Sequence, residues 1–311
     1  MDGKWLDDLK AHMLLSEAAQ RVLEVRLGVV RDRLPQAMFE ADKDVENVHQ
    51  LRVATRRAGA ALRIFRCCLP DKEFRRIRRR LRRLRRACGA ARDWDVFLAN
   101  LGVRLARARA DQRPGLDFLL GYGSGRRAAA QELLSPQEKK KPLTWDDWIQ
   151  HTLKSLHHPA HDGHLHQLRD LARPQLSALV QELEQAAGRD LNQYEHLHQV
   201  RILGKRLRYA MEIFESCYGP AFKNEYYPAI TEMQDILGDA NDSYVAAQRL
   251  TAILEQVKTV RPKGWERYEP GISALLRFHQ RRLPQKRREF EQWWARWQES
   301  GAEAAFASLI T

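Results

Sequence analysis

The stretch His49-Gln-Leu-Arg-Val-Ala-Thr-Arg-Arg57 returns as His198-Gln-Val-Arg-Ile-Leu-Gly-Lys-Arg206, 149 residues further along the chain. The same offset relates Ile64-Phe65 to Ile213-Phe214, Cys68 to Cys217, Gly89 to Gly238 and Asp93 to Asp242. It holds over 45 positions without a gap, which chance does not readily produce. An internal repeat of this length predicts two similar structural units within one chain.

Hydrophobic residues recur at intervals of three and four along the chain, and no segment alternates in the manner of a strand. We therefore predict an all-α protein with two pseudo-symmetric antiparallel helical bundles that arise from internal duplication. The expected helices span residues 5–40, 45–68, 71–88, 94–110, 115–134, 145–156, 163–187, 194–217, 225–237, 242–258 and 270–298.

A composition change near the middle of the chain suggests a boundary between the bundles. Residues 135–143 contain Pro136, Pro142 and three consecutive lysines, a composition typical of a solvated linker. We predict a first bundle over residues 1–134, a linker over 135–144, and a second bundle over 145–311 that includes a long C-terminal helix.

The chain of 311 residues carries a net charge of +13 and has a pI of about 9.8. Residues 49–92 hold 16 of its Lys and Arg residues but only two acidic residues, Asp71 and Glu73. So concentrated a positive charge indicates an acidic partner.

The four cysteines are dispersed and lack the spacing of a metal site, which suits a reducing cytosol. The first residues do not resemble a signal peptide, and no apolar run is long enough to span a bilayer. We expect a cytoplasmic protein with no membrane partner and no cofactor, and the sequence leaves its oligomeric state open.

Two helices are expected to carry basic stripes, because their basic residues recur at helical spacing. An anion between the two stripes would offset their mutual repulsion. The alternative is that both stripes are solvated helix faces, but that does not explain why the same basic positions recur in both copies. The first basic stripe consists of His49, Arg52, Arg56 and Arg63, and the second basic stripe of His198, Arg201, Lys205 and Arg208.

A further row of arginines lies beside the core positions of the next predicted helix: Arg75, Arg78, Arg82 and Arg85. A guanidinium group can grip two phosphate oxygens at once, so a row of them suits a chain of phosphates. The matching residues of the second copy are not basic, which indicates that the first half contributes more charge. Asp93 and Asp242 are expected to be N-caps of the helices that follow the glycines.

The motif at residues 49–57, the segment Gly89-Ala-Ala-Arg-Asp-Trp-Asp-Val96 and their divergent second copies resemble the CHAD family, the conserved histidine α-helical domain. The resemblance covers roughly residues 5–258. Members are two-bundle helical proteins that bind inorganic polyphosphate through basic residues and associate with polyphosphate granules. The resemblance implies binding roles for His49, Arg52, Arg56, Arg57, His198, Arg201, Lys205 and Arg206.

The sequence departs from its own repeat at Leu203-Gly204, where the first copy has Ala54-Thr55, so local packing is expected to differ between the copies. Taken together, the resemblance and the charge pattern predict non-catalytic binding of polyphosphate in a basic groove and association with polyphosphate granules.

Nucleic acid is the main alternative ligand, because phosphodiester backbones attract the same arginines. The basic segment offers only Phe65 and Phe74 as stacking platforms, which disfavours binding of unpaired bases. We also find no phosphate-binding glycine loop, nucleophile elbow or paired acidic metal ligands, so we do not expect an enzyme.

A metal site is a second alternative, suggested by six histidines between residues 151 and 166: His151, His157, His158, His161, His164 and His166. Pro159 and Gly163 interrupt this segment, and no cysteine or carboxylate pair completes a defined geometry. A solvated connector is the favoured interpretation.

Overall fold

The computed structural model describes residues 4–134, 144–159 and 166–310, and within them it contains helices and no strand. This confirms the prediction of an all-α protein. The α-helices are α1 (Leu15–Phe39), α2 (Glu46–Ile64), α3 (Asp71–Leu105), α4 (Arg113–Glu132), α5 (Trp145–Lys154), α6 (Leu168–Ala187), α7 (Tyr194–Phe214), α8 (Tyr227–Val260), α9 (Glu269–Glu299) and α10 (Ala302–Ile310). Short 3₁₀ or π turns extend α2 and α7 and precede α8 and α9.

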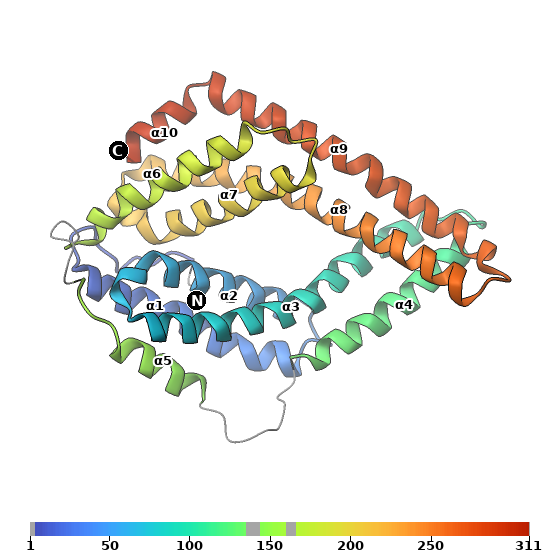
Figure 1. The fold of residues 1–311 in the computed structure, drawn as a ribbon, viewed down its shortest axis with the longest axis horizontal. Helices are drawn as coiled ribbons and strands as arrows, with labels where there is room; N and C mark the ends of the chain where they lie inside the picture. Colours follow the sequence, from blue (N-terminus) through green and yellow to red (C-terminus); the bar gives the residue numbers. More distant parts are fainter. Residues whose placement is uncertain (1–3, 135–143, 160–165, 311) are drawn as a thin grey trace.

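Figure 1 shows α1, α2 and α3 packed beside one another on one side of the molecule, with α6, α7 and α8 on the other. Helix α9 runs along α8 and also contacts α4. The two sides meet where α2 packs against α7.

Two long helices replace four predicted ones, because α3 and α8 continue through Gly89 and Gly238. The apolar face of α3 does not stop at the glycine, since Leu81, Cys88, Ala91 and Trp94 are all buried. A glycine inside a helix costs only about 1 kcal/mol, which the packing of this face can offset. The predicted breaks, and with them the caps at Asp93 and Asp242, were therefore wrong.

Helix α1 begins ten residues later than predicted, because the chain before it is held in an extended pairing. The Leu15 amide donates to the His166 carbonyl at 2.9 Å, and the Leu168 amide donates to the Met13 carbonyl at 3.0 Å. Leu14 and Gln167 form an isolated bridge between these hydrogen bonds. These bonds fix the start of both α1 and α6.

Helix α5 packs against α1 and α3, although the sequence division assigned it to the second bundle. The guanidinium group of Arg76 lies 4.2 Å from the Trp148 ring centroid, and that of Arg80 lies 4.6 Å from that of Trp145. These cation–π contacts attach α5 to the first half. Almost all of the predicted linker lies outside the described residues, and the position of the bundle boundary stays a prediction.

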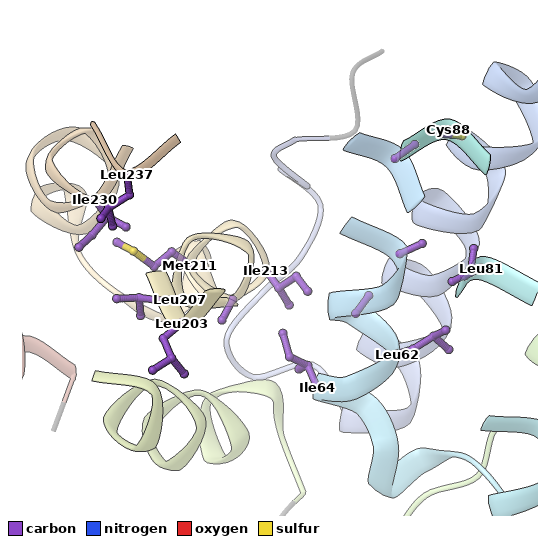
Figure 2. Close-up of a cluster of buried hydrophobic side chains, with 14 of the residues drawn as sticks. Leu62, Ile64, Leu81, Cys88, Leu203, Leu207, Met211, Ile213, Ile230 and Leu237 are labelled. Atoms are coloured by element: carbon purple, nitrogen blue, oxygen red, sulfur yellow. The ribbon is translucent and has the colours of Figure 1, made fainter. Parts of the chain in front are cut away.

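Apolar side chains connect the two halves. Figure 2 shows Ile64 of α2 and Ile213 of α7 pointing toward each other between the halves. Both side chains are buried, and they occupy matching positions of the repeat. Each half also has its own core beside this contact, with Leu62 and Leu81 on one side and Met211 and Ile230 on the other.

A buried ionic network also joins the halves at Glu212 of α7. Arg57 Nε lies 2.8 Å and Arg26 Nη2 lies 3.3 Å from Glu212 Oε2, while the Tyr227 hydroxyl donates to Glu212 Oε1 at 2.9 Å. The side chains of Arg26 and Glu212 are essentially inaccessible to solvent. The resemblance implied a binding role for Arg57, and the structure places its guanidinium group in this buried network.

Candidate functional site

A cavity of about 360 Å³ lies among α2, α3, α7, α8 and α9, and we call it the central pocket. Fourteen of its sixteen lining residues form seven pairs with the 149-residue offset. The pairs are His49 and His198, Arg52 and Arg201, Arg92 and Asn241, Asp93 and Asp242, Val96 and Val245, Phe97 and Ala246, and Asn100 and Arg249. Arg56 and His279 complete the lining. The repeat thus brings its matching positions to one cavity.

The uninterrupted helices α3 and α8 explain why both aspartates line this pocket. Arg52 Nη1 donates to Asp93 Oδ1 at 2.6 Å, and Arg249 Nη1 donates to the Asp93 carbonyl at 2.9 Å. Asp242 accepts a hydrogen bond from the Asn241 amide at 3.2 Å. The aspartates therefore hold neighbouring side chains of the lining in place. They also partly neutralise its positive charge, because basic side chains predominate there.

Both basic stripes reach the pocket, and they continue beyond it as a row of basic residues that are partly buried at Arg56 and Lys205 and exposed at Arg63. Burial, followed by the charges of Arg56 and Arg201, lowers the pKa of Lys205 to about 6. Burial, followed by the charge of Arg52, lowers the pKa of Arg56 to about 10. Burial and neighbouring positive charges both disfavour the charged form of these groups, and a bound anion would favour that form again.

The row extends to Arg63 and to the arginines of α3. Burial, then the charges of Arg206, Arg85 and Arg78, lowers the pKa of Arg63 to about 10. The pKa of Arg85 is lowered by burial and then by Arg82, Arg52 and Arg78. The row that we call the cationic face consists of Arg52, Arg56, Arg63, Arg78, Arg82, Arg85, Arg201, Lys205, Arg206 and Arg208.

Arg75 is not part of the cationic face. Its guanidinium group pairs with Asp71 at 3.3 Å, and its side chain is 68% exposed. At the far end of the face, Arg206 lies near Glu182, 3.8 Å away, and both side chains are largely exposed. The structure therefore brings together all the sequence-predicted arginines except Arg57 and Arg75.

The two repeat histidines face the central pocket and are held toward the neutral form. Burial is the first cause of the lowered pKa of His49 and of His198, followed by the charge of Arg92 or Arg201. The Tyr194 hydroxyl lies 3.3 Å from His198 Nδ1 and donates to Asn241 at 3.0 Å. An anion in the pocket would reverse the balance and favour the imidazolium form.

Sequence reasoning missed three further basic residues of the lining. Arg92 is the last residue of the basic segment 49–92, which was singled out from the sequence only for its net charge. Arg249 lies 149 residues after Asn100, so extending the repeat beyond Asp242 would have identified it. His279 comes from α9, outside the repeat, and had no signal in the sequence. Burial, then the charges of Arg282 and Arg104, lowers its pKa to about 4.

The predicted alternative of a histidine metal site is only partly covered by the described residues. His158 Nε2 and His166 Nδ1 lie 3.4 Å apart, and His151 Nε2 lies 3.1 Å from Glu73 Oε2. His161 and His164 lie outside the described residues. Among the residues that are described, no three histidine, cysteine or acidic side chains gather in a possible metal site. Within the same residues, no helix is long and apolar enough to cross a bilayer.

Comparison with known proteins identifies a protein family and solved structures that are similar to this chain. A family model described as CHAD domain matches residues 13–251. The fold is similar to the crystal structure of the CHAD domain from the plant Ricinus communis, with a TM-score of 0.63 and 27% identity, covering 86% of this chain and 94% of that one. It is also similar to PptA from Streptomyces chartreusis, with a TM-score of 0.65 and 18% identity, covering 91% and 100%. A comparison with curated proteins found no match.

Proposed function

Because the chain belongs to the CHAD domain family, we propose that it binds inorganic polyphosphate in the central pocket and along the cationic face. The observation that carries this proposal is the gathering of basic side chains there, where burial and then the charges of Arg56 and Arg201 lower the pKa of Lys205 to about 6. Among the described residues, Arg56, Arg63, Arg78 and Arg82 have no ion pair with a carboxylate. A chain of phosphates supplies the missing negative charge over the length of the face.

We propose binding without catalysis. Phosphoryl transfer needs a positioned nucleophile and metal ions in addition to positive charge. The carboxylate of Asp93 is held by Arg52 at 2.6 Å, and that of Asp242 by Asn241 at 3.2 Å, so both are engaged in orienting the lining. We extend this proposal to association with polyphosphate granules in the cytoplasm.

Polyphosphate is favoured over single-stranded nucleic acid because two aromatic rings near the pocket, those of Trp94 and Tyr194, already pack against other side chains. The Arg249 guanidinium lies 3.9 Å from the Trp94 ring centroid, and Tyr194 stacks on Tyr244 with their centroids 3.3 Å apart. Bases bind to single-strand binding proteins by stacking on free aromatic faces. Trp94 and Tyr194 therefore do not offer that platform.

The affinity for polyphosphate is expected to increase as pH falls from 8 to 6. A bound anion raises the pKa of Lys205, His49 and His198 above their values in the free protein, so binding takes up protons. Affinity then rises as pH falls through the bound-state pKa values, by about tenfold per pH unit for each proton taken up. Titration calorimetry at several pH values in buffers of matched ionic strength measures this slope.

Variants of Lys205, His49 and His198 separate the contributions of the lysine and of the histidines to the pH dependence of affinity. Lys205→Met should remove the lysine part of the slope, and His49→Gln with His198→Gln should remove the histidine part. Glutamine keeps hydrogen-bonding capacity without titrating in this range. If a folded variant with all three changes retained the wild-type slope, the protons would be taken up elsewhere and this arrangement of the ligand would be wrong.

A further inference from the structure

A second basic cleft, of about 400 Å³, lies between the C-terminal end of α3 and the first half of α9. We call it the α3–α9 cleft. Among the described residues, its lining contains no acidic residue but five arginines and two glutamines: Arg104, Arg107, Arg277, Arg281, Arg282, Gln112 and Gln285. Its α9 residues lie beyond residues 13–251, the part of the chain that matches the family model.

The charges in this cleft are largely uncompensated. Arg282 pairs with Asp239 at 2.7 Å, whereas the other four arginines make no ion pair within the described residues. The pKa of Arg104 is lowered by burial and then by the charges of Arg107 and Arg282. Packing against Phe278, with 3.5 Å between the guanidinium carbon and the ring centroid, holds Arg104 in place. The cleft therefore presents fixed positive charge.

The cleft and the central pocket share one turn of α9. His279 lines the central pocket, while Phe278 and Arg282 line the cleft. Burial, then the charges of Arg282 and Arg104, lowers the pKa of His279. Phe278 and His279 are consecutive residues of α9, so the cleft and the central pocket adjoin the same part of this helix. Figure 1 shows the start of α9 close to the end of α8, beside α4.

We propose that the α3–α9 cleft binds a second segment of the polyphosphate chain whose first segment occupies the central pocket. This inference rests on the proposed function and adds a path for the chain across α9. An unsubstituted phosphate chain fits the cleft better than nucleic acid, because its one lining aromatic ring, Phe278, is covered by Arg104.

The test compares tripolyphosphate with long-chain polyphosphate on a variant that carries Arg104→Gln, Arg107→Gln, Arg277→Gln and Arg281→Gln. Tripolyphosphate should keep its wild-type affinity, since the central pocket accommodates it. Long-chain polyphosphate should bind at least about tenfold more weakly, with a salt slope lower by about 3, because four phosphate contacts are lost. The control carries the same substitution at Arg189, Arg261, Arg288 and Arg296, which are exposed outside both sites.

Unchanged binding of the long chain by the cleft variant would overturn the inference and leave the proposed function standing. An equal loss of tripolyphosphate binding, or an equal loss in the control, would also overturn it, because net charge would then explain the effect. Failure of the wild-type protein to bind either polyphosphate would instead overturn the proposed function. Arg277→Gln with Arg281→Gln, at two exposed positions, should give about half the change in slope if the fourfold variant misfolds.

Discussion

Replacing Arg52 and Arg56 with glutamine is expected to weaken polyphosphate binding about 100-fold at neutral pH. In the proposed complex each guanidinium group would make charge-assisted hydrogen bonds worth about 1.5 kcal/mol or more, and 1.4 kcal/mol corresponds to a factor of ten in affinity. Loss of Arg52 also frees the Asp93 carboxylate, which it holds at 2.6 Å, to repel the ligand. Titration with long-chain polyphosphate at fixed salt measures the loss.

The matching change in the second copy, Arg201→Gln with Lys205→Gln, is expected to cost only about tenfold. With its pKa lowered to about 6, Lys205 is largely neutral at neutral pH in the free protein and must first gain a proton. The first copy also has the arginines of α3 beside it, and the second does not. Equal losses in the two double variants would contradict this asymmetry.

The control for both double variants is Arg189→Gln with Arg296→Gln, which removes the same charge from exposed positions outside the site. This variant should bind within about twofold of the wild type, because exposed charges are screened by salt. Thermal unfolding of all three variants checks that their folds are intact. A comparable loss in the control would mean that overall charge, and not the central pocket, governs affinity.

The largest effect on stability is expected from Glu212→Ala, which should lower the free energy of unfolding by about 3–5 kcal/mol. The Glu212 carboxylate is shared by the buried guanidinium groups of Arg26 and Arg57 and accepts a hydrogen bond from Tyr227. Its removal takes away the negative charge that these groups share across the junction of the two halves. Urea denaturation followed by circular dichroism gives the difference.

Glu182→Ala provides the matched comparison, because Glu182 forms an exposed ion pair with Arg206 at 3.8 Å. Exposed pairs contribute about 1 kcal/mol or less, so this variant should unfold nearly as the wild type does. If the two glutamate variants had the same stability, the buried network would not hold the halves together in the way described.

The helical periodicity and the repeat made the fold class predictable, but two features of the architecture depended on tertiary packing. Helices α3 and α8 run through Gly89 and Gly238 because their buried faces continue on both sides of the glycine. The attachment of α5 to the first half depends on Arg76 and Arg80 stacking on tryptophans that are distant in the sequence. Local sequence patterns do not contain that information.

The candidate site was predictable where it followed the repeat. His49, His198, Arg52 and Arg201 were expected to face an anion, and the structure places all four around one pocket. Arg57 could not be separated from its neighbour Arg56 by charge alone, because its buried partner, Glu212, is 155 residues away.

The measurement that tests the central claim most directly is competition between long-chain polyphosphate and single-stranded DNA of equal total charge for the wild-type protein in one buffer. The two ligands lose counterions in similar ways, so a difference in affinity reports recognition of the phosphate chain itself. We predict that polyphosphate displaces DNA at a concentration at least about tenfold below that at which DNA displaces polyphosphate. Equal displacement by the two ligands would contradict the account.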